Sequence, residues 1–442
     1  MPVAETLALR ARTLATDRGI GPGPAALALA LPFLFLHIKY QPGVRVPLGS
    51  THLGLELSDL AVVVVAVFAL REGLRRGFAA LRPALALWIS SAALLLWIFL
   101  RSESLTHFVT AAKFAEYALL AVSAPLILRR RADWELVAAV VVAWSVAATL
   151  FGLVQFLGAD IADAWAAGRR QPSFLGHSDF AALSALALGI GFAGVLLARR
   201  GVGWVAIASG GVGLILSGAT AGLIGVVAGA AALLYVISKR RRLAARDFAV
   251  TGTVVALVAG GVLGLRAGDL EHFLRFLHLK GRETQSGNIQ TYSHHTLLAY
   301  IGYRIWREHP LAGAGWQAST KAETVDPVLP AARRKFPDVS PLAFPTRAHE
   351  WGVQNAYVQA ASDLGVIGLV LWLAPFALAL VLALRANAPP GAVAVFTILA
   401  AMGIWGGQGL VAGIPLDAVT WLGFGLAATA AAQRTSAAAQ GK

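Results

Sequence analysis

Long runs of apolar residues alternate with short polar segments along most of this chain. A bilayer core about 30 Å thick needs roughly 20 apolar residues in a helix, and fewer where flanking residues reach the interface. The pattern therefore predicts an all-α integral membrane protein with about twelve transmembrane helices. The expected spans are residues 23–39, 56–71, 82–100, 108–128, 135–157, 178–198, 202–217, 219–238, 247–265, 364–384, 391–412 and 416–433.

One long polar segment, residues 266–350, interrupts this pattern between the ninth and tenth spans, and the amphipathic run 351–364 follows it. We expect an N-terminal transmembrane region of about nine helices over 1–265 and a C-terminal one of about three helices over 364–442. Between them, residues 266–363 form a large, partly helical loop, named here the loop domain. Its six His residues and its many Arg residues predict that it covers the site of the chemistry.

Composition supports a membrane protein. The chain is 57% hydrophobic and only 14% charged, whereas soluble domains carry about 25% charged residues. The net charge of +14 can indicate nucleic acid binding. Here, however, the Arg residues cluster in short loops between apolar runs, as membrane orientation and anionic lipid head groups favour, so no nucleic acid partner is expected.

The same Arg clusters predict the orientation. If the N-terminus is cytoplasmic, nearly every basic loop lies on one side of the membrane, and the C-terminus returns to that side. The loop domain is then extracytoplasmic. The chain has no Cys, which excludes thiol nucleophiles and thiolate metal sites.

Two candidate stretches lie at outward ends of spans. In GRRQPSFLGHSDF, residues 168–180, Arg169 and Arg170 precede His177. Guanidinium forks suit phosphate oxygens, although an interfacial Arg pair reaching to lipid head groups has the same pattern. In SGATAG, Ser217 and Thr220 either contact a substrate or allow close helix packing.

A third candidate stretch, SHHTLLAYIGYRIWREHP, predicts a helix over residues 293–308 that ends before a proline. Arg304 interrupts its apolar pattern as a candidate phosphate-binding residue. His294 and His295 lie on different helical faces, so only one of them is expected to point at a substrate.

A fourth candidate stretch, TRAHEWGVQNAY, places Arg347 and His349 before an amphipathic turn. His accepts a proton near neutral pH, so His349 is a candidate general base, although a structural His that caps the helix is the alternative. In the turn, the candidate residues for contact with a substrate that accepts a transferred group are Gln354, Asn355 and Tyr357.

Lys113 and Glu116 lie three residues apart on one face of the fourth span. Intramembrane charges usually form pairs or line a water-filled cavity, so these two either line the site or pair away from it. No His pair has the spacing of a metal-binding helix, and Arg residues can neutralise a phosphate instead. No metal and no other cofactor are expected.

Several of these motifs together resemble those of the O-antigen ligase and O-antigen polymerase superfamily of bacterial membrane glycosyltransferases. EHPLAGAGWQ is similar to the family's hPl-x-G-x-G, and QNAYVQAASDLGVIGL to its HN-x-y-l-q followed by l-G-l-x-G-l. PSFLGHSDFAA and SGATAG are similar to two further family motifs, GtF-x-n-p-N-x-x-A and S-x-x-R-g. The pattern resembles a Gram-positive branch of the superfamily.

The resemblance implies an all-helical enzyme in the bacterial cytoplasmic membrane that transfers a glycan from undecaprenyl diphosphate to an acceptor, without a metal. Three positions depart from the family: Thr220 replaces an Arg, Gln354 replaces a His, and His295 replaces another Arg. We therefore expect His349 to be the base. Donor binding is expected from the residues Arg169, Arg170, Arg304, Arg347, His294 and His295.

Three functions remain open from the sequence. A ligase transfers the glycan to a lipid- or cell-wall-anchored sugar, whereas a polymerase transfers it to a second lipid-linked repeat unit. A flippase or transporter moves a lipid-linked sugar without breaking a bond. The absence of a visible inverted repeat and the scarcity of intramembrane charges count against the transporter.

Overall fold

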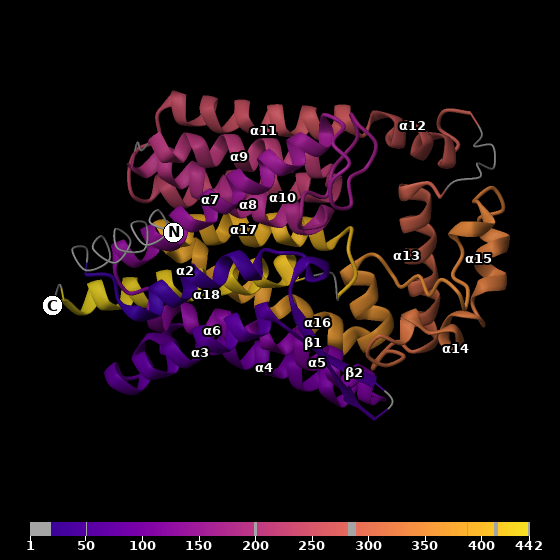
Figure 1. The fold of residues 1–442 in the computed structure, drawn as a ribbon, viewed down its shortest axis with the longest axis horizontal. Helices are drawn as coiled ribbons and strands as arrows, with labels where there is room; N and C mark the ends of the chain where they lie inside the picture. The colour runs from indigo at the N-terminus through magenta and orange to yellow at the C-terminus, as the bar shows by residue number, and fades with distance from the viewer. Residues whose placement is uncertain are drawn as a thin grey trace, which may run out of the picture.

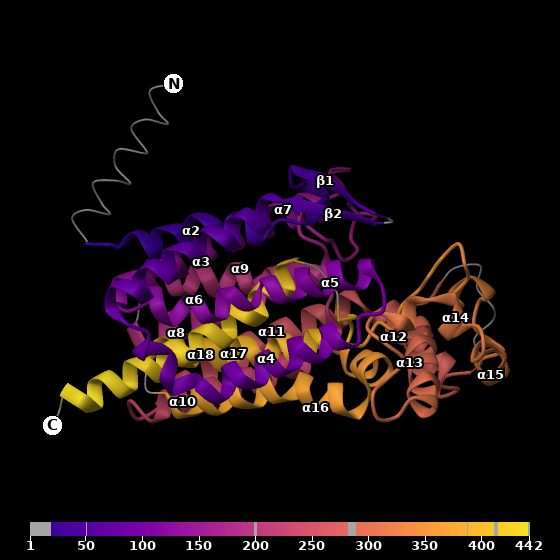
Figure 2. The same cartoon turned by 90° about the horizontal axis from the view of Figure 1, so that it is seen from below.

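The computed structural model describes residues 19–49, 51–198, 201–281, 289–386, 388–410 and 414–440. Its helices lie side by side along one axis, with the first and last described residues at one end of the bundle and the loop domain at the other (Figures 1 and 2). Each expected span coincides with one helix or with two successive helical segments. Among the described residues, seven helices are long and apolar enough to cross a membrane. The chain is thus a multi-pass membrane protein, and the number of twelve crossings remains a prediction.

The N-terminal region contains ten α-helices in the described part of the chain, in the order α2 Pro22–Leu34, α3 Leu57–Arg76, α4 Leu85–Leu100, α5 Leu105–Glu116, α6 Ala118–Ile127, α7 Arg131–Phe156, α8 His177–Ala193, α9 Gly201–Ser217, α10 Thr220–Ser238 and α11 Ala245–Leu265. A short 3-10 helix, Ala79–Ala84, precedes α4, and a π-helical turn, Gly194–Ala198, extends α8. α8 is apolar on all faces and is the most enclosed of the candidate spans, as expected of a helix that other helices surround.

Small residues set the close packing around α8. A β-carbon placed on Gly210 of α9 would lie 2.6 Å from the carbonyl oxygen of Ser184 in α8. One placed on Gly225 of α10 would lie 2.1 Å from the carbonyl oxygen of Leu399. Because there is no room for a side chain at either position, the backbones approach closely, as is typical of membrane helices.

A β-hairpin between α2 and α3 was not expected from the sequence. Strands β1 Gly43–Leu48 and β2 Thr51–Glu56 pair antiparallel, with Gly43 opposite Glu56 and Leu48 opposite Thr51. The all-α expectation is therefore incomplete at this point. The expected fourth span also differs, because it consists of two helices, α5 and α6, that meet at Tyr117.

The loop domain has a small core of its own. Its helices are α12 Ala267–Phe276, α13 Thr291–Glu308, α14 Ala322–Val325 and α15 Leu329–Lys335. Apolar residues of α13, such as Leu298 and Ile301, pack with Val325 and Phe344. The helix expected over residues 293–308 corresponds to α13.

The C-terminal region consists of α16 Ala356–Arg385, α17 Pro389–Trp405 and α18 Ile414–Gln440. α16 is kinked at Gly365, where φ is 72° and ψ is −171°. The amphipathic run and the tenth span are therefore two segments of one bent helix, and its first segment contacts the loop domain.

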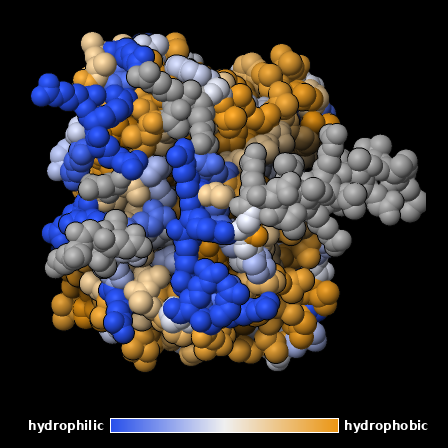
Figure 3. Space-filling view, turned by 90° about the vertical axis from the view of Figure 1, so that its left-hand side faces the viewer, coloured by the Kyte–Doolittle hydropathy of each residue, from blue (hydrophilic) through white to orange (hydrophobic). Residues whose placement is uncertain are grey.

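Hydrophilic residues gather at the end of the bundle opposite the loop domain, as the view of that end in Figure 3 shows. Several of the residues at helix ends there are basic. α3 ends in Arg75 and Arg76, while Lys239 and Arg434 donate hydrogen bonds to the last backbone carbonyls of α16. This distribution agrees with the expected cytoplasmic position of the termini, which remains a prediction.

Candidate functional site

A cavity of about 550 Å³ lies where the helix bundle meets the loop domain. Its walls come from the start of α8, the turn between α9 and α10, the start of α13, and the segment after α17. Polar or charged side chains that line it are His37, Arg170, His177, Ser178, Asp179, Ser217, Thr220, Arg266, Thr291, Tyr292, His295, Thr296 and Gln408.

Trp165 supports one wall of the cavity. The guanidinium carbon of Arg170 lies 4.2 Å from the centroid of the Trp165 ring, and the His177 ring lies 4.6 Å from it in an edge-on arrangement. The loop that carries Trp165 is fixed by Gln171, whose backbone N–H donates to the carbonyl of Leu216 at 2.8 Å. The expected grouping of Arg170 with His177 is therefore present in the structure.

Arg266 forms the neighbouring wall. Its guanidinium lies 5.2 Å from the centroid of the Tyr292 ring and forms an ion pair with Asp269 at 3.0 Å. The hydroxyl of Tyr292 is hydrogen-bonded to that of Thr220 at 2.9 Å. Thr220 stands where the similar family motif has an Arg. Here it helps to hold the Tyr292 ring against the guanidinium of Arg266.

The two Arg side chains meet at Gly218. A β-carbon placed there would lie 2.9 Å from Cβ of Arg170 and 3.3 Å from Cδ of Arg266. Burial, followed by the charge of Arg266, lowers the pKa of Arg170 to about 10. The Nε atoms of both side chains are buried without a hydrogen-bond partner among the described residues. Among the described residues Arg170 forms no ion pair and Arg266 pairs only with Asp269, so guanidinium donors remain unpaired, which favours an anionic ligand.

The two adjacent His residues of α13 point to different places. His295 lines the cavity, whereas His294 is buried against Trp351, with ring centroids 5.2 Å apart. Burial lowers the pKa of each imidazole to about 4. For His295, the charges of His294, Arg170 and Arg266 contribute to this lowering of the pKa after burial. Both rings are therefore neutral at physiological pH.

Other residues expected to bind the donor lie outside the cavity. Arg169 is exposed, 5.8 Å from the centroid of Trp165. Arg304 donates to the hydroxyl of Tyr300 at 3.4 Å, and Arg347 is exposed near the surface of the loop domain. The roles predicted for these three residues are not supported by their positions.

His349, the base expected from the sequence, is exposed and stacks on Trp351 with ring centroids 6.0 Å apart. The backbone N–H of His349 donates to the carbonyl of Thr346, and the N–H of Thr346 donates to the carbonyl of His349. This arrangement places the imidazole on the surface of the loop domain and outside the cavity lining.

The residues in and after the turn that precedes α16 mainly hold that helix in place. Asn355 caps the helix by accepting from the N–H of Val358 at 3.0 Å, and its amide donates to the carbonyl of Gly406 at 2.9 Å. The hydroxyl of Tyr357 donates to the carbonyl of Met402 at 2.6 Å. Gln354 is partly buried and does not line the cavity. These contacts attach α16 to the segment that forms the far wall of the cavity.

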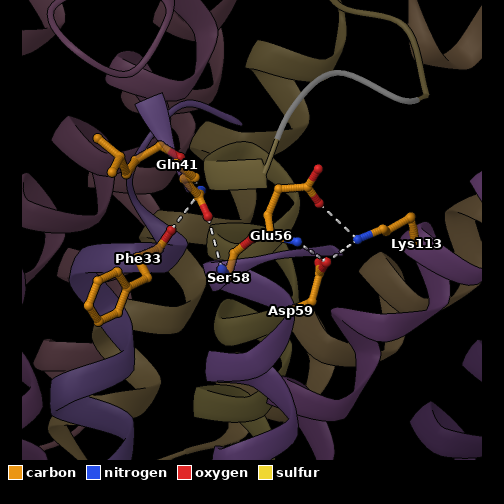
Figure 4. A network of polar contacts seen from close by, with 7 residues as sticks. Phe33, Gln41, Glu56, Ser58, Asp59 and Lys113 are labelled. Carbon is orange, nitrogen blue, oxygen red and sulfur yellow. Dashed lines mark hydrogen bonds and ion pairs between the residues drawn. The ribbon is translucent and has the colours of Figure 1, made fainter. Parts of the chain in front are cut away.

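Lys113 belongs to a separate polar network (Figure 4). Its ammonium pairs with Asp59 and, at 3.1 Å, with Glu56, so α5 is tied to the start of α3. Neither Lys113 nor Glu116 lines the cavity. Of the two roles left open for this pair, the contacts of Lys113 fit an ion pair away from the site.

Residues 204–373 match a family model whose description is O-antigen ligase. Over these residues the chain is similar to the O-antigen ligase family. The resemblance found in the sequence motifs is thereby confirmed over these residues, which run from α9 into α16. A search of curated proteins found no match.

The residues that match the family model supply part of the cavity, including Arg266 and His295, while Arg170 and Asp179 come from outside the matched residues. Sequence reasoning missed Arg266, although it is the first charged residue after an apolar span, because it was assigned to the polar loop as a whole. In the described residues, no group of three or more His, Asp or Glu side chains is arranged to hold a metal ion.

Proposed function

We propose that this protein is a glycosyltransferase that moves a glycan from undecaprenyl diphosphate to a sugar hydroxyl of an acceptor. The observation that carries the proposal is the pair Arg170 and Arg266, which line one cavity beside membrane helices. Among the described residues Arg170 forms no ion pair, and Arg266 pairs only with Asp269. A diphosphate supplies the missing negative charge. The O-antigen ligase match over residues 204–373 supports a lipid-linked glycan as the substrate.

The proposed reaction is a direct displacement. The acceptor oxygen forms a bond to the anomeric carbon while the bond from that carbon to the diphosphate oxygen breaks. The diphosphate leaves with the bonding electron pair, and a base takes the hydroxyl proton. Arg170 and Arg266 neutralise the leaving group, and the partly desolvated cavity strengthens their effect.

The proposed location is the outer face of the bacterial cytoplasmic membrane. It is supported by the basic residues at one end of the bundle, such as Arg75 and Arg76 at the end of α3, because positive residues favour the cytoplasm. The cavity is lined partly by residues of the loop domain, which lies at the other end of the bundle (Figure 1). The donor's isoprenoid chain then stays in the bilayer. The acceptor is a lipid- or cell-wall-anchored glycan that reaches the cavity from outside.

Reconstitution tests this proposal. Purified protein in liposomes, supplied with an undecaprenyl-diphosphate-linked glycan and a panel of acceptors, is expected to release undecaprenyl diphosphate and to form a glycosylated acceptor. A single transfer to each acceptor indicates a ligase, and a ladder of lengthening products indicates a polymerase. Movement of the lipid-linked glycan across the bilayer without release of undecaprenyl diphosphate would show that the protein is a flippase.

Gly218 provides a further test of the cavity. Gly218→Ala is expected to lower transfer on the order of 10²-fold, because φ is +63° and the new methyl group would displace Arg170. The initial rate of undecaprenyl diphosphate release measures this effect. Gly260→Ala on α11 is a matched control, since a β-carbon at Gly260 meets no atom within 4 Å. Equal rates for both variants would contradict the predicted contact between Gly218 and the Arg pair.

A further inference from the structure

Asp179 is the only carboxylate among the described residues that line the cavity. It lies in the first turn of α8 and is buried, with 5% of its surface exposed. It forms no ion pair with Arg170 or Arg266 among the described contacts, and so its charge is not used to offset theirs. The reaction proposed above requires a proton acceptor, and a carboxylate can take that proton.

The two oxygens of Asp179 have different surroundings. Oδ1 accepts a hydrogen bond from the N–H of Leu416 at 3.0 Å. Oδ2 receives no hydrogen bond from a described residue. A β-carbon placed on Gly176 would lie 3.2 Å from Oδ2 and 3.4 Å from Cδ2 of His37, so the carboxylate and the imidazole flank this glycine. One oxygen is thus fixed by the backbone, and the other remains available beside His37.

Two His residues that line the cavity, His295 and His37, are weak alternatives. The pKa of His295 is lowered to about 4, first by burial and then by neighbouring positive charge. Nδ1 of His37 accepts from the N–H of Lys39 at 3.2 Å, which leaves the ring proton of the neutral form on Nε2. Neutral His37 can therefore donate a hydrogen bond but has no free nitrogen to take a proton.

We infer that Asp179 is the catalytic base for the acceptor hydroxyl, with His37 beside it as a hydrogen-bond donor to the acceptor sugar. This inference rests on the proposed function. The proton passes from the hydroxyl to Oδ2 of Asp179 as the new bond to the anomeric carbon forms. Asp179 takes the role that the sequence alone suggested for the exposed His349.

Asp179→Asn tests the assignment, because the amide keeps the size of the side chain and an oxygen that can accept from Leu416. Its kcat is expected to fall by about 10²-fold or more, while its affinity for undecaprenyl diphosphate, measured by direct binding, stays within about 3-fold of wild type. Asp133→Asn is the matched control. Asp133 is also a buried carboxylate in the first turn of a helix, α7, but it does not line the cavity. Its kcat is expected to stay within about 3-fold of wild type.

Chemical rescue separates catalysis from a structural role. Asp179→Ala removes both carboxylate oxygens, and added formate is expected to restore part of its kcat, because a small carboxylate can enter the vacated space and take the proton. Rescue does not depend on equal folding of the variant, since the same sample is compared with and without formate.

The outcomes distinguish the two proposals. If the wild-type protein transfers glycan and Asp179→Asn transfers at the same rate, or if formate restores nothing to Asp179→Ala, the assignment of the base is wrong and the proposed function stands. If the wild-type protein binds undecaprenyl diphosphate but no acceptor is glycosylated, both proposals fail.

Discussion

Replacing Arg266 with Gln is expected to lower glycan transfer by on the order of 10²- to 10³-fold. Only 3% of the surface of Arg266 is exposed, and the only ion pair of this side chain in the described structure is with Asp269. A guanidinium held away from water interacts strongly with a leaving diphosphate, and Gln supplies neither its charge nor its paired donors. Arg170→Gln is expected to have an effect of similar size. Release of undecaprenyl diphosphate measures both.

Two controls make this prediction specific. Arg275→Gln changes a partly exposed Arg near the end of α12, the helix that follows Arg266, and is expected to leave transfer nearly unchanged. Asp269→Asn removes the ion-pair partner of Arg266 but leaves its charge in place, so transfer is expected to fall by much less than in Arg266→Gln. If Arg275→Gln loses as much activity as Arg266→Gln, the effect comes from overall positive charge and the cavity is not the donor site.

The transmembrane helices could be predicted from the sequence because a single length scale determines them. α7 and α11 are long apolar runs with charged residues at their borders, and the bilayer thickness makes such runs recognisable without tertiary information. The hairpin formed by β1 and β2 could not be predicted in the same way. Its strands have six residues each, and most of their side chains are at least partly exposed. The alternation of apolar and polar residues that predicts a strand is therefore weak here.

The candidate site was predicted only in part. Arg170 and His177 lie close together in the chain and so were grouped correctly by sequence proximity. Arg266 and Asp179 were missed, because their positions depend on tertiary structure. Arg266 lies in the cavity because of the junction between α11 and α12, and Asp179 because α8 packs against α18. The exposure of His349 could not be predicted either, since it depends on how the loop domain folds. In that fold the His349 ring stacks on Trp351 at the surface.

The connection between the loop domain and the helix bundle depends on Asp363. This residue is fully buried in α16. Its carboxylate accepts hydrogen bonds from the N–H of Ser319 at 3.0 Å and from the amide of Gln359 at 3.0 Å. Its backbone carbonyl also accepts from the N–H of Gly315 at 2.9 Å. Asp363 therefore attaches the segment that follows α13 to the first part of α16, and so fixes the wall of the cavity that His295 provides.

Asp363→Ala is expected to destabilise the protein by about 3 kcal/mol or more, because two buried donors lose their acceptor and a cavity replaces the carboxylate. Thermal unfolding in detergent should show a melting temperature several degrees lower, and limited proteolysis should cut the loop domain before the helix bundle. Asp326→Ala, at an exposed position of the same domain, is expected to change neither result. If Asp363→Ala resists protease as well as wild type does, then contacts other than this carboxylate hold the loop domain against the membrane helices, and the cavity owes its shape to them.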